Sequence, residues 1–235
     1  MAFGVFCALD GYAVSHLFAS VGYDFVIIDL QHAAYTWPEI ENMCFRIRSE
    51  GAAVFLRTAS TEPAEVNLAL DLPIDGVVLP NISSLAEARA AVAQTKFPPD
   101  GERSLGNERH DTIWQAYDAP EPLVGMLVEH KGAVAEIEQI FSELPIDFAW
   151  IGTHDLSASM GFDPHDVVAG GKVPPELTVA IDRIRAAARA SGVRFWAAEP
   201  GADATITGVD ARIVRQAALD ALHRTRDRLQ PRADL

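Results

Sequence analysis

Phe25-Val26-Ile27-Ile28-Asp29 is apolar at its first four positions and ends in a carboxylate. A strand with one face in water alternates apolar and polar residues, so this continuous run predicts a strand of a parallel sheet that is covered on both faces. Val77-Val78-Leu79 has the same character. Both stretches favour an α/β fold in which helices cover a parallel sheet.

Runs of this kind alternate with helical patterns along the chain. The expected strands are residues 3–9, 24–29, 53–57, 76–79, 124–128, 148–151, 194–197 and 212–214. The expected helices are residues 12–20, 37–50, 63–70, 85–94, 133–142, 175–190 and 217–229, with at most a turn or two of helix over 202–208. The long stretches 97–117 and 162–175 are expected to be loops.

Eight units of strand and helix predict a (β/α)8 TIM barrel, whose usual length is about 250 residues. We therefore expect residues 1–235 to form a single domain around a parallel eight-stranded barrel. A doubly wound open sheet is the competing arrangement. Its dinucleotide-binding form has little support, because no Gly-x-Gly-x-x-Gly motif follows an early strand.

The composition excludes several classes of partner. The chain has 19 Lys and Arg against 33 Asp and Glu, a net charge of −14, and no basic run that could bind nucleic-acid phosphates or an anionic membrane. No apolar run approaches the ~20 residues of a membrane span, and no secretory leader is recognisable. Cys7 and Cys44 stand alone in apolar stretches and are expected to be buried free thiols. These features favour a cytoplasmic protein.

Polar residues follow several of the expected strands at the point where each strand ends. Asp29 ends the second strand and His32 follows three residues later, while Arg57 ends the third strand. Glu129 follows the fifth strand, and Gly152-Thr153-His154-Asp155 follows the sixth. Reactive groups of TIM barrels gather at this edge of the barrel, so we expect these side chains to converge.

Each residue has a chemical and a structural interpretation. Glu129 and Asp155 offer the hard oxygen ligands that Mg²⁺ or Mn²⁺ prefers, but they could instead cap helices or pair with basic residues. Arg57 needs an anionic partner, either a substrate carboxylate or a structural Asp. His32 suits general-base catalysis because its intrinsic pKa is close to working pH, although a structural role is open. Asp71, taken alone, is a polar residue at a helix end.

At these positions the chain resembles the HpcH/HpaI aldolase family. These are metal-dependent class II pyruvate aldolases, and they include 4-hydroxy-2-oxoheptanedioate aldolase and 2-dehydro-3-deoxyglucarate aldolase. The resemblance covers about residues 4–192. Besides Arg57, the motifs that carry it are Gly22-Tyr23-Asp24-Phe25-Val26-Ile27-Ile28-Asp29, Gln31-His32-Ala33, Leu70-Asp71, Gly76-Val77-Val78-Leu79-Pro80, Pro98-Pro99-Asp100-Gly101-Glu102-Arg103 and Ile151-Gly152-Thr153-His154-Asp155-Leu156-Ser157-Ala158-Ser159-Met160-Gly161.

The resemblance implies roles for individual residues. His32 is similar to the family's catalytic base, and Arg57 to the residue that holds the pyruvyl group and stabilises its enolate. Asp71 is similar to the carboxylate that raises the basicity of the histidine. Glu129 and Asp155 are similar to the ligands of a divalent metal ion, Mg²⁺ or Mn²⁺, with Co²⁺ as a further candidate.

Substrate contacts follow from the same resemblance, and here the chain also departs from the family. The implied substrate-binding residues are Arg57, Leu127, Gly152, Thr153, His154 and Asp155, and a loop with Arg103 and Gly106 is expected to border the site. The family usually has Gln where this chain has Leu127, Glu in place of Gln31, and Pro-Ala in place of Thr153-His154. These departures concern the choice of substrate, while the charged groups are kept.

The implied function is reversible retro-aldol cleavage of a 4-hydroxy-2-oxo acid into pyruvate and an aldehyde, through a metal-stabilised pyruvate enolate. Two alternatives stay open. One is a related carbon–carbon lyase or decarboxylase that acts on oxaloacetate or an acyl-CoA, and the other is a non-catalytic barrel that binds ketoacids. The resemblance also implies a homo-oligomer, a hexamer of the family type, with no nucleic-acid or membrane partner.

Overall fold

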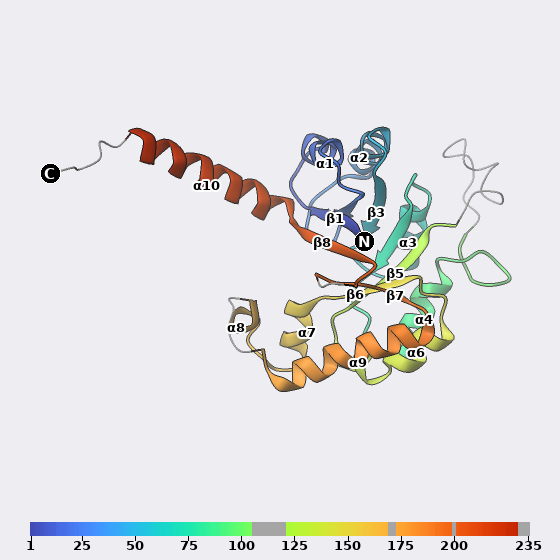
Figure 1. The fold of residues 1–235 in the computed structure, drawn as a ribbon. Coiled ribbons are helices and arrows are strands. Elements are labelled where there is room, and N and C mark those ends of the chain that lie inside the picture. Colours follow the sequence, from blue (N-terminus) through green and yellow to red (C-terminus); the bar gives the residue numbers. More distant parts are fainter. Residues whose placement is uncertain (105–120, 169–172, 199–200, 230–235) are drawn as a thin grey trace.

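A computed structural model describes residues 1–104, 121–168, 173–198 and 201–229 of the chain. Within these residues, parallel strands β1 to β8 pair in chain order and β8 pairs with β1, so that the sheet closes into a barrel (Figure 1). The expected (β/α)8 barrel is confirmed. The strands are β1 (Ala2–Cys7), β2 (Phe25–Asp29), β3 (Ala53–Arg57), β4 (Gly76–Leu79), β5 (Leu123–Val128), β6 (Phe148–Ile151), β7 (Arg194–Trp196) and β8 (Ala204–Val209).

Helices lie between most successive strands of the barrel, and the last helix follows β8. They are α1 (Tyr12–Ser20), α2 (Trp37–Ser49), α3 (Pro63–Leu70), α4 (Leu85–Ala93), α5 (Lys131–Ala135), α6 (Ile137–Glu143), α7 (Thr153–Ser159), α8 (Pro164–Val168), α9 (Pro175–Ser191) and α10 (Asp210–Leu229). The single helix expected over 133–142 is divided between α5 and α6, and α7 and α8 occupy stretches for which no helix was expected.

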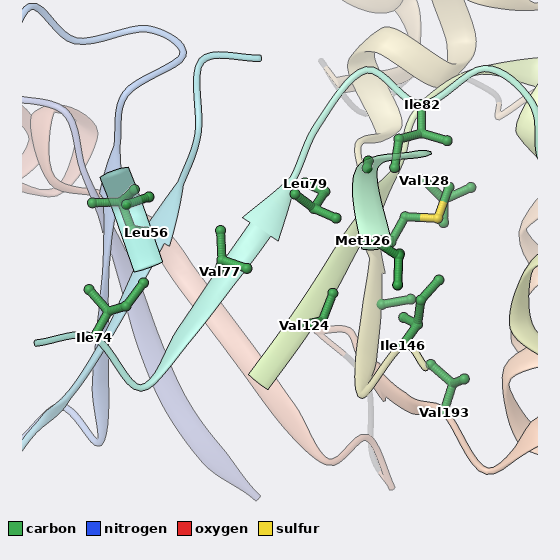
Figure 2. Packing of buried hydrophobic residues seen from close by; sticks show 14 of the residues in the cluster. Leu56, Ile74, Val77, Leu79, Ile82, Val124, Met126, Val128, Ile146 and Val193 are labelled. Carbon is green, nitrogen blue, oxygen red and sulfur yellow. The ribbon is translucent and has the colours of Figure 1, made fainter. Parts of the chain in front are cut away.

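The outer faces of the strands pack against the helices. Val77 and Leu79 of β4 and Val124, Met126 and Val128 of β5 belong to this outer core, and each is at most 1% exposed (Figure 2). Alternate residues of each strand point to opposite faces, so the residues between them point into the barrel. This is why the strands are apolar at consecutive positions.

Aromatic rings fill the inside of the barrel. Phe148 stacks on Trp196 with ring centroids 3.9 Å apart. Glycines on neighbouring strands make room for such rings: a Cβ atom on Gly125 would lie 2.1 Å from the ring of Phe148. Three glycine–phenylalanine pairs stand in register across adjacent strands, Gly4–Phe25, Gly76–Phe55 and Gly125–Phe148.

The eighth strand was predicted at the wrong place. Residues 212–214 lie inside α10, and the strand is β8, which covers most of the stretch for which at most a turn or two of helix was expected. β8 was missed because its threonines and glycine interrupt the apolar run that marks the other strands. The buried carboxylate of Asp210 fixes the start of α10, since it accepts hydrogen bonds from the N–H groups of Ala8 and Leu9 at 3.1 and 2.9 Å.

The two longest helices differ in how they meet the barrel. α9 lies along it and buries an apolar face that includes Leu177, Ile184 and Ala188. α10 runs away from the barrel (Figure 1), and Asp210 at its start is its buried residue. Val214 and Leu222 of α10 are more than 40% exposed.

Cys7 and Cys44 are buried free thiols, as expected. Burial raises the pKa of Cys44 to about 12, which keeps it protonated and unreactive. The described residues contain no helix that is both long and apolar enough to cross a membrane.

Candidate active site

Charged side chains occupy the inside of the barrel where the strands end. Asp29 and Arg57 are the last residues of β2 and β3 and stand in register, and Glu129 directly follows β5. All three are at least nine-tenths buried. Each stands two positions beyond an inward-facing apolar residue of the same strand, namely Ile27, Phe55 and Leu127. The predicted convergence of these side chains on one edge is therefore observed.

Asp29 holds Arg57 in one orientation. Arg57 donates from Nε to Oδ1 of Asp29 at 2.8 Å and from Nη2 to Oδ2 at 2.6 Å. The guanidinium also lies over the ring of Phe6, with Cζ 4.9 Å from the ring centroid. The structural partner weighed for Arg57 is thus present. In the part of the chain that the structure describes, Nη1 has no protein acceptor, so its N–H groups are available to an anionic ligand.

Glu129 is the buried carboxylate with a free oxygen. It is 3% exposed, and its Oε1 accepts a hydrogen bond from the N–H of Asn81 at 2.6 Å. Its Oε2 is buried and has no hydrogen-bond partner among the described residues. A Cβ atom on Gly152 would lie 2.9 Å from this Oε2. Glycine at position 152 therefore lets the backbone after β6 lie against this carboxylate, where a Cβ atom would collide with it.

The charges around Glu129 favour a cation. Burial raises the pKa of Glu129, and the carboxylates of Asp155 and Asp29 raise it further. The N–H of Asn81 and the guanidinium of Arg57 act in the opposite direction. Three carboxylates thus share the site with one guanidinium, and a bound cation would relieve their mutual repulsion.

The donor set fits a divalent metal ion with an incomplete protein shell. Across residues 1–104, 121–168, 173–198 and 201–229, no group of three or more His, Cys, Asp or Glu side chains converges on one point. A metal at Glu129 and Asp155 would therefore complete its shell with substrate and water oxygens, which is the habit of Mg²⁺. The unpartnered Oε2 of Glu129 is the observation that supports this fit.

His32 lies on the loop between β2 and α2, and its side chain is exposed. Its neighbour Gln31 donates its backbone N–H to Oδ1 of Asp29 at 3.0 Å. This bond ties the loop to the charged layer, by which we mean Asp29, Arg57 and Glu129. The side-chain oxygen Oε1 of Gln31 is buried without a partner among the described residues. The base predicted at position 32 therefore lies at the same end of the barrel as Arg57.

Gly152, Thr153, His154 and Asp155 form the start of α7. Gly152 is the residue before the helix, and its carbonyl accepts the first helical hydrogen bond, from Leu156 at 2.8 Å. The N–H groups of Thr153, His154 and Asp155 consequently have no partner inside the helix. His154 and Asp155 are exposed. Within the part of the chain that the structure describes, these N–H groups have no acceptor, and the stretch lies next to Glu129.

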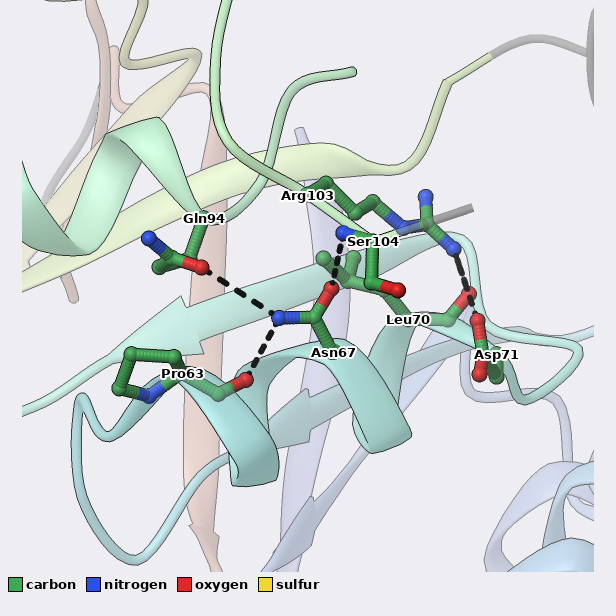
Figure 3. Close-up of polar contacts among 7 residues, drawn as sticks. All are labelled: Pro63, Asn67, Leu70, Asp71, Gln94, Arg103 and Ser104. Carbon is green, nitrogen blue, oxygen red and sulfur yellow. Dashed lines mark hydrogen bonds and ion pairs between the residues drawn. The ribbon is translucent and has the colours of Figure 1, made fainter. Parts of the chain in front are cut away.

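Asp71 is not brought to His32 in this chain. It follows α3, close to where β4 begins at Gly76, whereas His32 lies at the end where the strands finish. Arg103 donates from Nη2 to Oδ1 of Asp71 at 3.3 Å and to the carbonyl of Leu70 at 2.7 Å (Figure 3). The Asp71–His32 pair implied by the family resemblance is thus not formed within one copy of the chain.

The surroundings of Arg103 tie α3 to the segment that follows α4. Ser104 donates its N–H to Oδ1 of Asn67 at 2.9 Å, and Nδ2 of Asn67 donates to the carbonyl of Pro63 at 2.7 Å (Figure 3). The Arg103 guanidinium lies 4.5 Å from the ring centroid of Phe97. Gly106, expected beside the site, lies outside the described residues.

Sequence reasoning left the partner of Arg57 open and missed Asn81 and Phe6. Asp29 ends an apolar strand next to Arg57 in the predicted barrel, so adjacent strand ends could have paired them. Asn81 contributes its backbone N–H, for which residue type gives no signal. Phe6 shares the inward face of β1, which strand alternation could have assigned.

The comparisons with known proteins agree with this arrangement. The family model described as HpcH/HpaI aldolase/citrate lyase matches residues 2–220. A hydroxypyruvate/pyruvate aldolase of Rhizorhabdus wittichii is 30% identical over 190 residues, 79% of this chain and 74% of that protein. A 4-hydroxy-2-oxo-heptane-1,7-dioate aldolase of Salmonella paratyphi C is 30% identical over 236 residues, 92% of this chain and 86% of that protein.

Solved structures show the same fold. A protein of the HpcH/HpaI aldolase/citrate lyase family from Burkholderia cenocepacia superposes with a TM-score of 0.83 at 25% identity, over 96% of this chain and 94% of that one. The resemblance inferred from the sequence motifs is therefore confirmed. The chain belongs to the HpcH/HpaI aldolase/citrate lyase family and is a carbon–carbon lyase of the aldolase type.

Proposed function

We propose that this enzyme catalyses the reversible retro-aldol cleavage of a 4-hydroxy-2-oxo acid into pyruvate and an aldehyde. The observation that carries the proposal is the pairing of opposite charges at the barrel edge. Oε2 of Glu129, which has no partner among the described residues, lies buried against Gly152, and Asp29 fixes the guanidinium of Arg57 at the same edge of the barrel. Cleavage creates a negative enolate oxygen, and fixed positive charge is what such a site needs.

Glu129 and Asp155 would hold the divalent ion, Mg²⁺ or Mn²⁺, with Co²⁺ as a further candidate. When bound, this ion supplies Lewis acidity that polarises the 2-oxo group. The N–H groups of Thr153 and His154 at the start of α7 would donate hydrogen bonds to the substrate carboxylate, because a helix start carries a partial positive charge. Leu127 would line the same space from β5.

His32 is the proposed base. It takes the proton of the C4 hydroxyl, the C3–C4 bond breaks, and the C4 oxygen becomes the carbonyl of the departing aldehyde. The electron pair of the broken bond passes to the pyruvate enolate, whose oxygen accepts hydrogen bonds from the N–H groups of Arg57. Protonation at C3 then gives pyruvate. In the direction of synthesis the same groups act in reverse.

Asp71 enters the proposal only through an oligomer. Asp71 and His32 lie at opposite ends of the barrel, so an Asp71–His32 pair requires a second copy of the chain. We propose a homo-oligomer, a hexamer of the family type. The projecting helix α10, with Val214 and Leu222 exposed, supports an assembly because it leaves apolar side chains without cover in one copy. The free buried thiols Cys7 and Cys44 support the cytoplasm as its compartment.

The related lyase reaction on oxaloacetate or an acyl-CoA stays as the second candidate, because the matching family description includes citrate lyase. Such a reaction would pass through a similar enolate and would use the same charged layer. The non-catalytic ketoacid-binding barrel is set aside, because the family is one of enzymes.

Pyruvate release from a panel of 4-hydroxy-2-oxo acids tests the proposal. Protein stripped with EDTA should be inactive, and Mg²⁺, Mn²⁺ or Co²⁺ should restore cleavage. Glu129→Gln should lose the restored activity. The exposed carboxylate of Glu138, paired with Arg183 at 2.7 Å, provides the matched control, since Glu138→Gln should keep it. Metal-independent cleavage, or normal turnover by Glu129→Gln, would refute the proposal, and turnover of oxaloacetate alone would favour the second candidate.

A further inference from the structure

An apolar surface adjoins the charged layer on one side, and we name its residues Phe6, Leu127 and Trp150 the donor wall. Phe6 and Leu127 are 7% and 2% exposed, and Trp150 is half-buried. The rings of Phe6 and Trp150 meet edge to face with centroids 5.0 Å apart. Leu127 and Trp150 are register partners on β5 and β6. The three side chains therefore form one continuous surface inside the barrel.

The donor wall reaches the charged groups at two points. Cγ of Leu127 lies 3.4 Å from the Cβ position at Gly152, the same position that is 2.9 Å from Oε2 of Glu129. Phe6 lies beneath the guanidinium of Arg57 at 4.9 Å. A small molecule placed between Glu129 and Arg57 would therefore contact this wall.

The wall offers little to a hydroxyl group. Phe6 and Leu127 have no polar side-chain atoms, and Trp150 has one N–H group, which donates and cannot accept. Both oxygens of the neighbouring Asp29 carboxylate already accept hydrogen bonds from Nε and Nη2 of Arg57. A hydroxyl buried against such a surface loses its hydrogen bonds to water without replacing them.

Resting on the proposed function, we infer that the donor wall selects 2-oxo acids whose C3 is apolar. The carboxylate and the 2-oxo group of a donor have charged or N–H partners in the site, so C3 is the group left to face the wall. Pyruvate and 2-oxobutanoate are donors of this class, and hydroxypyruvate, with its C3 hydroxyl, is disfavoured. This would set the chain apart from its Rhizorhabdus relative, whose name includes hydroxypyruvate.

The test compares donors rather than aldehydes. Metal-loaded protein is given pyruvate, 2-oxobutanoate or hydroxypyruvate with one small aldehyde, and kcat/KM is measured for each donor. Exchange of C3 hydrogens in D2O reports enolate formation without any aldehyde, and calorimetry gives the Kd of each donor. An apolar pocket discriminates against an added hydroxyl by about 10- to 100-fold, so we expect a preference of this size for pyruvate.

Leu127→Gln and Leu127→Met form a matched pair, because Gln and Met have similar length and differ in polarity. Leu127→Gln should reduce the preference for pyruvate by about tenfold in both kcat/KM and Kd, and Leu127→Met should keep it. Trp150→Phe removes the indole N–H and should also keep the preference.

Equal use of pyruvate and hydroxypyruvate by the native enzyme would overturn the inference and leave the aldolase function standing. So would an unchanged ratio in Leu127→Gln, or a loss of hydroxypyruvate binding in Trp150→Phe, which would show that the indole N–H donates a hydrogen bond to the hydroxyl oxygen. Absence of C3 exchange and cleavage with every donor, in folded metal-loaded protein, would instead refute the proposed function on which the inference rests.

Discussion

Two layers of side chains inside the same barrel have opposite character. The lower layer is apolar and largely aromatic: Phe148 stacks on Trp196, and Phe55 meets both rings edge to face. Two residues further along the strands, the layer at the barrel edge consists of acidic and basic side chains, with Arg57 above Phe55 and Glu129 above Leu127. The strands, their register and their inward direction are shared.

The difference shows that the two layers have separate roles: the lower layer stabilises the barrel, and the layer at the barrel edge carries the reactive groups. Rings in the lower layer gain free energy by leaving water and packing closely. The charged layer loses free energy on burial, and it recovers only part of it through the Arg57–Asp29 pair, because Oε2 of Glu129 has no partner among the described residues. Substitutions in the two layers should therefore differ in what they change.

The largest expected effect is on stability, from Phe148→Ala in the lower layer. Phe148 is fully buried, so its truncation leaves a cavity inside the barrel. Such changes cost about 3–5 kcal/mol of unfolding free energy. Chemical denaturation would measure this loss. Phe3, on β1 but 48% exposed, is the control, and Phe3→Ala should stay within about 0.5 kcal/mol.

The second effect is on rate, from Arg57→Ala in the charged layer. Loss of a donor that stabilises an enolate oxygen should lower kcat by about 10²–10³-fold. The variant also leaves Asp29 buried and unpaired, which should destabilise the fold. The double variant Asp29→Asn with Arg57→Ala should recover stability without recovering kcat. Recovery of kcat in that double variant would show that Arg57 acts only as the partner of Asp29.

The third effect separates crowding from backbone strain. Gly152→Ala places a methyl group 2.9 Å from Oε2 of Glu129, so metal affinity and kcat should fall, by up to about 10²-fold in rate. Its φ of −78° suits alanine, so the backbone adds no strain, and any loss of stability comes from the contact of the new methyl group with Cβ of the buried Glu129 at 2.8 Å. Gly161, at φ 90° with open space around it, is the control: Gly161→Ala should lose stability and keep kcat in the folded fraction. A Gly152→Ala enzyme with native metal affinity would contradict this account.

These layers were predictable from the sequence to different extents. Continuous apolar runs located seven of the strands, and the polar residues that follow Phe25-Val26-Ile27-Ile28 and the third and fifth strands located the charged layer. β8 was missed because its apolar residues are interrupted by Thr205, Thr207 and Gly208. The pairing of Asp71 with Arg103 joins two segments 32 residues apart, which no local pattern reports.

The smallest expected effect has the opposite sign to the others, because Glu129→Gln should stabilise the metal-free protein at neutral pH. Burial raises the pKa of Glu129 above its ordinary 4.5, so the folded state disfavours the ionised form that this carboxyl adopts in the unfolded chain at neutral pH. This cost is fully present above the raised pKa and disappears as the pH falls below 4.5, where the carboxyl is protonated in both states. Thermal unfolding in EDTA should show a higher Tm for Glu129→Gln near pH 7 and equal values near pH 4.

Glu138→Gln is the control and should show the reverse sign, because Arg183 lowers the pKa of Glu138. Its Tm should fall only slightly, since the Glu138–Arg183 pair is exposed. Saturating metal should then invert the order of the native protein and Glu129→Gln, since binding stabilises only the form that keeps the carboxylate. A native protein more stable than Glu129→Gln in EDTA at pH 7 would mean that the carboxylate serves the fold, and the separation of the two layers would fail.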